Sequence, residues 1–159
     1  MGILYRNTKL EDLNKIVTFP QDDQESFYLF SVTESLTLDI LLSFYQKRFG
    51  STSFWLNGEV IGYANFYRYR DDPKDIIYLG NVIVSPEHRG KGYSKEIVKT
   101  MIEKAKNEFN ATELRLAVFC HNRIAYTLYQ KMNFKTLWQE TRINFEKEEE
   151  PICIMGRKL

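Results

Sequence analysis

Apolar residues recur along the chain with two different periods, which predicts both helices and strands. Between residues 92 and 109 they are spaced three and four positions apart, as on one face of an amphipathic helix. Residues 75–84 form a short, almost continuous apolar run of the kind found in buried strands. In chain order, the pattern predicts a strand at 3–6, helices at 8–16 and 37–49, strands at 53–56, 59–69 and 75–84, a helix at 92–109, a strand at 113–119, a helix at 122–132, and strands at 136–145 and 152–157.

Turn-forming residues mark several of these boundaries. Asn57-Gly58 predicts a tight hairpin, because both residue types accept positive φ. We expect Gly50 to end the helix at 37–49 and Asn133 to cap the helix at 122–132. Residues 19–35 are polar and aromatic without a clean period, which indicates a loop. The order of elements predicts an α/β fold, with a mixed sheet covered by helices, in one domain over residues 1–159.

Composition and charge narrow the possible functions. The net charge of +1 over 159 residues gives no general attraction to nucleic acid or to anionic lipid. There is no apolar run long enough for a membrane span and no signal-peptide pattern. Cys120 and Cys153 are too few for a disulfide framework or a zinc site, which favours a reducing cytoplasm. With His88 and His121 as the only histidines, we expect no metal site.

The segment with the clearest chemistry is NVIVSPEHRGKGYS, residues 81–94. A strand ends, a loop with two glycines follows, and the long helix begins. The free N–H groups and partial positive charge of a helix N-terminus bind phosphate, and Gly90 and Gly92 allow the backbone to approach an anion. Arg89 and Lys91 add positive charge there. The spacing does not fit a dinucleotide-binding GxGxxG, because Lys95 occupies the third glycine position, and no P-loop spacing occurs.

What fits best is R-x-x-G-x-[G/A], with Arg89 and Gly92 at its first two defined positions and Ser94, also small, in place of the usual Gly or Ala. The segment NRIAYTLYQKMNF follows downstream. With these two motifs in this order, the chain resembles the GNAT superfamily of acyl-CoA-dependent N-acetyltransferases. The resemblance implies a mostly antiparallel central sheet with helices on both faces and two splayed strands at the coenzyme A site. It also implies transfer of an acetyl group from acetyl-CoA to a primary amine by direct attack in a ternary complex.

The resemblance assigns roles to individual residues. Tyr129 would be the general acid that protonates the departing thiolate, an interpretation that its spacing from Asn122 favours over simple packing on the buried helix face. Asn122 would contact the pantetheine arm, and Asn is also a preferred helix N-cap. A backbone N–H near Ile83 or Val84 would stabilise the oxyanion. The expected coenzyme A-binding residues are Ile83, Val84, Arg89, Gly90, Lys91, Gly92, Tyr93, Ser94 and Asn122.

The acceptor side is less defined. Some family members have a glutamate as general base where this chain has Asn81, which cannot take a proton, so an ordered water chain beside Asn81 is one route. Phe30 and Glu34 are candidates for shaping the acceptor site. The acceptor could be a polyamine, an amino acid, an antibiotic or a protein amine, and the protein a monomer or a homodimer. Two other classes stay open: a non-catalytic acyl-CoA-binding module and an unrelated phosphate-binding α/β domain.

Overall fold

A computed structural model describes residues 2–31 and 35–159 of the chain. Within these residues, seven strands form a single sheet with the order β1-β2-β3-β4-β5-β7-β6. All neighbours pair antiparallel except β4 and β5, which run parallel, so the sheet is mixed, as predicted. The strands are β1 (Leu4–Asn7), β2 (Phe49–Leu56), β3 (Glu59–Tyr67), β4 (Ile76–Val84), β5 (Glu113–Phe119), β6 (Lys135–Ile143) and β7 (Glu149–Lys158).

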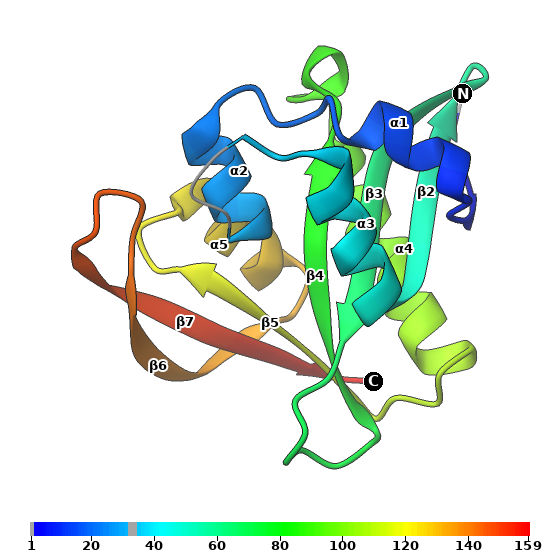
Figure 1. Cartoon of the computed structure of the whole chain (residues 1–159). Helices are drawn as coiled ribbons and strands as arrows, with labels where there is room; N and C mark the ends of the chain where they lie inside the picture. The colour runs from blue at the N-terminus through cyan, green and yellow to red at the C-terminus, as the bar shows by residue number, and fades with distance from the viewer. Residues whose placement is uncertain (1, 32–34) are drawn as a thin grey trace.

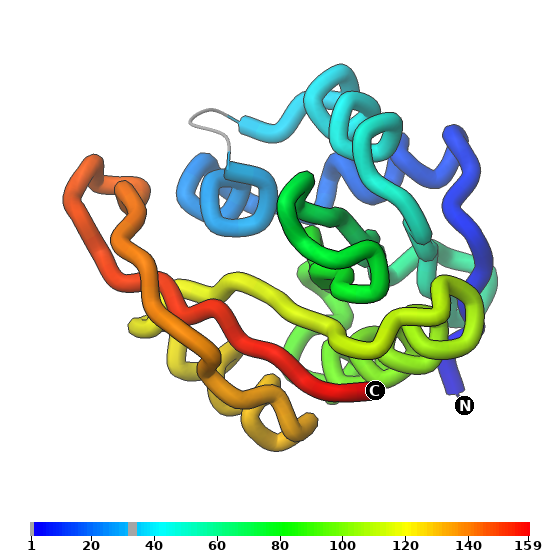
Figure 2. The backbone as a smooth tube through the Cα atoms, turned by 90° about the horizontal axis from the view of Figure 1, so that it is seen from below, coloured from blue at the N-terminus to red at the C-terminus, as the bar shows by residue number. Residues whose placement is uncertain are grey.

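Helices cover both faces of this sheet (Figures 1 and 2). The helices are α1 (Leu13–Ile16), α2 (Asp23–Phe30), α3 (Leu38–Lys47), α4 (Tyr93–Asn107) and α5 (Arg123–Lys131), with 3-10 turns η1 (Leu10–Asp12) and η2 (Pro86–His88). Side chains of α1 to α3 pack on one face around Tyr63, and those of α4 pack on the other around Phe66. No helix of the described chain combines the length and the apolar character that a membrane span requires.

The prediction of a loop over residues 19–35 is wrong for its middle part, which forms α2. Asp22 caps this helix, and its carboxylate accepts a hydrogen bond of 2.8 Å from the Glu25 N–H. The helix is short and has aromatic residues on more than one side, so it has no strong periodicity to detect. Gly50 also differs from the prediction: α3 ends before it, and Gly50 lies within β2 with a φ of 62°.

The parallel pair β4 and β5 stays together for only three residues, from Ile76 beside Glu113 to Tyr78 beside Arg115. Beyond that point β5 continues to pair with β7 as far as Phe119. Strand β4 bends away, with Asn81 in a left-handed conformation at φ 50°. The two central strands therefore diverge, as the family resemblance implied, and leave room between their ends.

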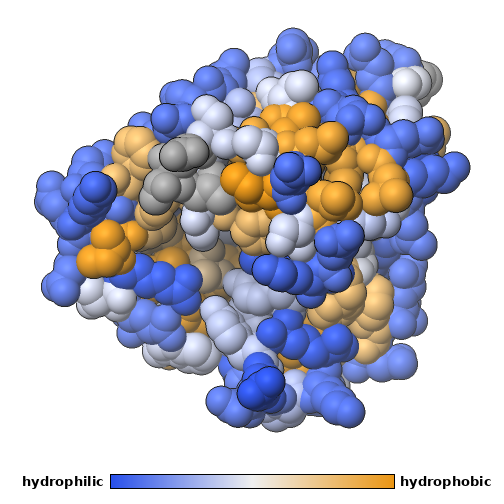
Figure 3. Space-filling model, in the orientation of Figure 1, coloured by the Kyte–Doolittle hydropathy of each residue, from blue (hydrophilic) through white to orange (hydrophobic). Residues whose placement is uncertain are grey.

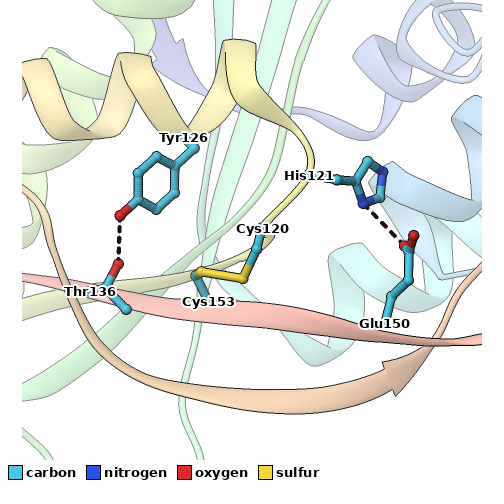
Figure 4. Close-up of a disulfide and its surroundings, with 6 residues drawn as sticks. All are labelled: Cys120, His121, Tyr126, Thr136, Glu150 and Cys153. Carbon is cyan, nitrogen blue, oxygen red and sulfur yellow. Dashed lines mark hydrogen bonds and ion pairs between the residues drawn. A yellow bond between two sulfur atoms is a disulfide. The ribbon is translucent and has the colours of Figure 1, made fainter.

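A disulfide joins the end of β5 to β7, between Cys120 and Cys153 (Figure 4). Their Cα atoms are 5.5 Å apart, within the ordinary range for a disulfide. Sequence reasoning did not predict this bond, because the two residues are far apart in the chain and no third cysteine suggests a framework. The sequence favoured a reducing compartment because two cysteines are too few for a disulfide framework, and the bond removes that reason. The cytoplasmic location stays a prediction.

Loss of this disulfide should destabilise the fold. The bond closes a loop with a sequence separation of 33 residues, and a loop of this length corresponds to about 3–4 kcal/mol of unfolding free energy. A reductant should therefore lower the melting temperature of the wild-type protein. The double variant Cys120→Ala/Cys153→Ala should melt at the reduced protein's temperature and not respond to reductant. A wild-type melting temperature that is indifferent to reductant would contradict the bond.

Candidate active site

A cavity of about 600 Å³ lies where β4 and β5 diverge. Helix α2 borders it, and the molecular surface is hollowed there, between the β6–β7 lobe and the middle of the molecule (Figure 3). The ring of Tyr28 on α2 packs edge-on against Phe119 of β5, and Phe27 packs against Phe145 next to β6. Helix α2, which the sequence analysis missed, therefore contacts both β5 and the connection between β6 and β7, and it forms a wall of the cavity.

Two of the predicted residues reach this cavity from α5. Asn122 lines the cavity and caps the helix, since its side-chain oxygen accepts a 3.3 Å hydrogen bond from the Ala125 N–H. Tyr129 lines it about two turns of helix further on, with its ring edge-on to Phe134. Burial raises the pKa of Tyr129 to about 12, and no described residue hydrogen-bonds its hydroxyl. At neutral pH this phenol is protonated and has a proton to donate.

The glycine loop and the start of α4 have the properties of an anion site. Gly90 and Gly92 have φ of 73° and 86°, and a Cβ on either would meet open space. Gly92 is the N-cap position directly before α4, and no side chain caps the helix there, so the first N–H groups stay available to a ligand. Lys91 is exposed between the glycines, and Tyr93 and Ser94 are half-buried in the first turn.

Arg89 has a different environment from the one expected. Its guanidinium donates to the carbonyls of Val84, at 2.9 Å, and Phe19, at 3.0 Å, and forms a 2.6 Å ion pair with Glu25 of α2. These contacts fasten the loop to β4 and to α2. In this structure Arg89 therefore fixes the loop, and the positions left open to an anion are the glycine backbone and Lys91.

Ile83 and Val84 lie beyond the cavity. Both are buried, at 3% and 6% exposure, and pair with β3 opposite Tyr63 and Gly62. The part of β4 that lines the cavity is the preceding run from Leu79 to Val82. The predicted oxyanion donor near Ile83 and Val84 thus lies next to the cavity wall but is not part of it.

Asn81 belongs to a buried polar network. Its side-chain oxygen accepts from Arg48 Nη1 at 2.9 Å and from Asn65 Nδ2 at 2.8 Å, and its Nδ2 donates to the Leu29 carbonyl at 2.6 Å. Asn65 also donates to the Tyr63 hydroxyl at 3.2 Å. Protein groups therefore occupy the Asn81 side-chain oxygen, and a water chain beside Asn81 stays a prediction.

Replacing Asn81 should therefore cost stability. Asn81→Ala removes one acceptor from Arg48 and one from Asn65, and it removes the amide that donates to the Leu29 carbonyl. The unfolding free energy should therefore fall by about 2–4 kcal/mol. Asn81→Gly also lacks the amide but tolerates the φ of 50°, so it should be about 1 kcal/mol more stable than the alanine variant. Urea denaturation measures both. An alanine variant as stable as the wild type would show that the network contributes nothing.

Arg48 is the main site residue that sequence reasoning missed. It follows α3, and its guanidinium lies between the rings of Phe44 and Tyr67, 4.8 and 4.4 Å from their centroids. Burial lowers its pKa. Gly80 faces Arg48 Nη1 so closely that any side chain at that position would displace the guanidinium. The only signal in the sequence was an arginine beside an apolar helix, which is too common to single out.

The remaining candidates are divided. Phe30 is buried and lines the cavity, with its ring against Phe44. Glu34 lies outside the described residues. His121 is exposed and pairs with Glu150 at 3.0 Å without lining the cavity, and His88 Nδ1 hydrogen-bonds the Ser85 hydroxyl at 2.7 Å within the loop. In the described chain, no three His, Cys, Asp or Glu side chains gather in a group that could hold a metal ion.

This fold and cavity correspond to a known class. The model of the acetyltransferase (GNAT) family matches residues 11–134. The match spans well over half of the chain, so the protein belongs to the acetyltransferase (GNAT) family. The prediction from the two motifs is thereby confirmed at the level of family and enzyme class.

Individual relatives show how far the similarity extends. An N-alpha-acetyltransferase of Saccharolobus solfataricus is 27% identical over 146 residues, which are 82% of this chain and 78% of the relative. A thialysine N-epsilon-acetyltransferase of Bos taurus is 35% identical over 79 residues, 49% of this chain and 46% of the relative, so the match spans about half the bovine protein. The yncA structure of Salmonella typhimurium, solved with its cofactor acetyl-CoA, covers 100% of this chain and 95% of its own, with TM-score 0.82 and 18% identity.

Proposed function

We propose that this protein transfers an acetyl group from acetyl-CoA to a primary amine by direct attack within the cavity between β4 and β5. The observation that supports this most strongly is that the half-buried Tyr129 lines the cavity and that its hydroxyl has no hydrogen-bond partner among the described residues. Within a GNAT fold, an unpaired phenol at that place is suited to donate a proton to a leaving group.

The chain's own groups suit coenzyme A at both ends of its path. The uncapped N-terminus of α4 and the two glycines offer N–H groups for the pyrophosphate, and Lys91 adds a positive charge. Asn122 at the start of α5 and the exposed edges of the diverging strands would contact the pantetheine arm. The diverging strands also leave backbone groups of β4 free of β5, where an extended amide chain can pair.

Acetyl-CoA supplies the acetyl group in activated form, as a thioester. The attacking amine must be neutral, and an alkyl amine with a pKa near 10.4 is mostly protonated at pH 7. The described cavity lining includes no carboxylate and no histidine, so we propose that water takes this proton. Tyr129 donates a proton to the departing sulfur. Burial raises the pKa of a thiol as it raises that of a phenol, so both groups shift in the same direction there.

The test is a thiol-release assay with acetyl-CoA and a broad panel of amines. We expect release that depends on both the protein and an amine. Binding of acetyl-CoA without turnover of any amine would instead identify a non-catalytic acyl-CoA-binding module. Binding of nucleotides in place of coenzyme A would show that the anion site does not serve an acyl donor, and would contradict acetyl transfer.

A further inference from the structure

The acceptor end of the cavity has positive charge and aromatic surface. In the described part of the chain, Arg48 and Arg142 are its only charged lining residues, and no Asp or Glu lines it. Tyr67 and Tyr69 connect the two arginines. The Arg48 guanidinium lies 4.4 Å from the Tyr67 ring centroid, the two tyrosine rings are 5.8 Å apart, and Arg142 Nη2 is 3.5 Å from the Tyr69 hydroxyl.

Arg48 is a half-buried cation that has no anionic partner among residues 2–31 and 35–159. Its hydrogen bonds go from Nη1 to the amide oxygens of Asn65 and Asn81, and the rings of Phe44 and Tyr67 contact its planar faces. Nη1 is thus fixed by protein groups, whereas the other guanidinium nitrogens have no described acceptor. A buried charge without a partner is costly unless something compensates it, so a ligand anion at this place would be favourable.

Arg142 reaches the same place from β6. Its guanidinium is partly balanced by Glu140, with Nη2 3.2 Å from Oε2, but Glu140 does not line the cavity. Burial raises the pKa of the Tyr67 phenol, and the charges of Arg48 and Arg142 both oppose that rise. Arg48, which follows α3, and Arg142 on β6 are far apart in the chain, and both place their positive charge near Tyr67.

We propose that the acceptor is a small amine that also has a carboxylate, as amino acids do, and that Arg48 binds this carboxylate with Arg142 beside it. This inference rests on the proposed acetyl transfer. Arginine is suited to the role because its planar group offers two parallel N–H donors to a carboxylate. A polyamine would instead place additional positive charge next to two arginines, with no lining carboxylate to offset it.

The size of the cavity supports a small acceptor. Its volume of about 600 Å³ has to accommodate the acetyl end of the cofactor as well as the amine. The rings of Phe27, Tyr28 and Phe44 leave an apolar surface for the remaining part of the acceptor. An amino acid or a similar compound with an apolar or aromatic side chain matches this combination.

The test compares acceptors in pairs that differ only in the carboxylate. Each of the common amino acids is assayed with acetyl-CoA beside its carboxamide, with the polyamines spermidine and spermine as polycationic acceptors that lack a carboxylate. We expect at least one amino acid whose kcat/KM exceeds that of its amide by about 10- to 100-fold, as loss of one charge-assisted interaction requires. Equal rates for the pair, faster turnover of polyamines, or no turnover of any carboxylated amine would each overturn the inference.

Variants separate the carboxylate site from the rest of the enzyme. Arg48→Gln should raise KM for the amino acid about 10- to 100-fold while leaving the Kd of acetyl-CoA unchanged. Arg142→Gln, at a half-buried position outside the Asn81 network, repeats the test where Arg48→Gln fails to fold. Arg70→Gln removes a charge from an exposed position that does not line the cavity and should change nothing.

These results also distinguish the two proposals from each other. Turnover of amines lacking a carboxylate at rates equal to or above those of their carboxylated counterparts, with acetyl-CoA bound normally, would overturn the acceptor assignment and leave acetyl transfer intact. Failure of acetyl-CoA to bind would overturn both.

Discussion

Tyr129→Phe should lower kcat by about 10²- to 10⁴-fold, the usual effect of removing a proton donor from a reacting group. The variant keeps the ring that packs against Phe134, so the fold and the Kd of acetyl-CoA should change little. The reason is that the lost hydroxyl acts on the leaving sulfur and not on the bound cofactor. Steady-state kinetics and calorimetry together measure the two effects.

Tyr126→Phe is the matched control for this experiment. Tyr126 lies on the same helix, but its hydroxyl hydrogen-bonds Thr136 at 2.9 Å and does not line the cavity (Figure 4). Its loss should affect stability slightly and kcat hardly at all. Equal kcat in Tyr129→Phe and the wild type would remove the proposed role of Tyr129.

The pH profile gives a second view of the same group. Burial raises the pKa of Tyr129 to about 12, so the phenol keeps its proton at neutral and moderately alkaline pH. The wild-type rate should therefore rise from pH 7 to pH 10 as more of the amine becomes neutral. A rate that falls over this range in the wild type but not in Tyr129→Phe would indicate a phenol that ionises much earlier.

Gly92→Val should weaken acetyl-CoA binding about 10- to 100-fold, equivalent to one or two lost hydrogen bonds to a charged group. Gly92 has a φ of 86° at the start of α4, and its Cβ position is open to solvent. A branched side chain there disfavours the backbone conformation and blocks close approach of a phosphate. Calorimetric titration gives the Kd directly.

Gly58→Val controls for the strain in that variant. Gly58 has a similar φ of 81° in the β2–β3 hairpin, also with open space at its Cβ position. It should lose comparable stability without any change in the Kd of acetyl-CoA. If both valine variants bind equally well, the N-terminus of α4 is not the phosphate site.

Local signals in the sequence predicted most of the fold. Asn57-Gly58 adopts the positive φ values that its hairpin requires, and Asn133 has the expected φ of 67°. The periodic helix at 92–109 and the strand at 113–119 correspond to α4 and β5. Each of these features depends on residues close together in the chain, which is why a single sequence is enough to find them.

The proposed acceptor side could not be predicted in the same way, because it forms by contacts over long sequence distances. Arg48 comes directly after α3 in the sequence, and its side chain hydrogen-bonds to Asn81 on β4. Its connection to Arg142 on β6 runs through the side chains of two tyrosines. Nothing within a few residues of Arg48 indicates those partners. The Cys120–Cys153 bond has the same origin, since β5 and β7 become neighbours only when the sheet forms.

The most direct test of acetyl transfer by this chain is a calorimetric titration of the purified protein with acetyl-CoA. Roughly one-to-one binding in the micromolar range, weakened in Gly92→Val and unchanged in Gly58→Val, is the result that we predict. No binding of acetyl-CoA would contradict the proposed function and with it the roles assigned to the loop, to Asn122 and to Tyr129.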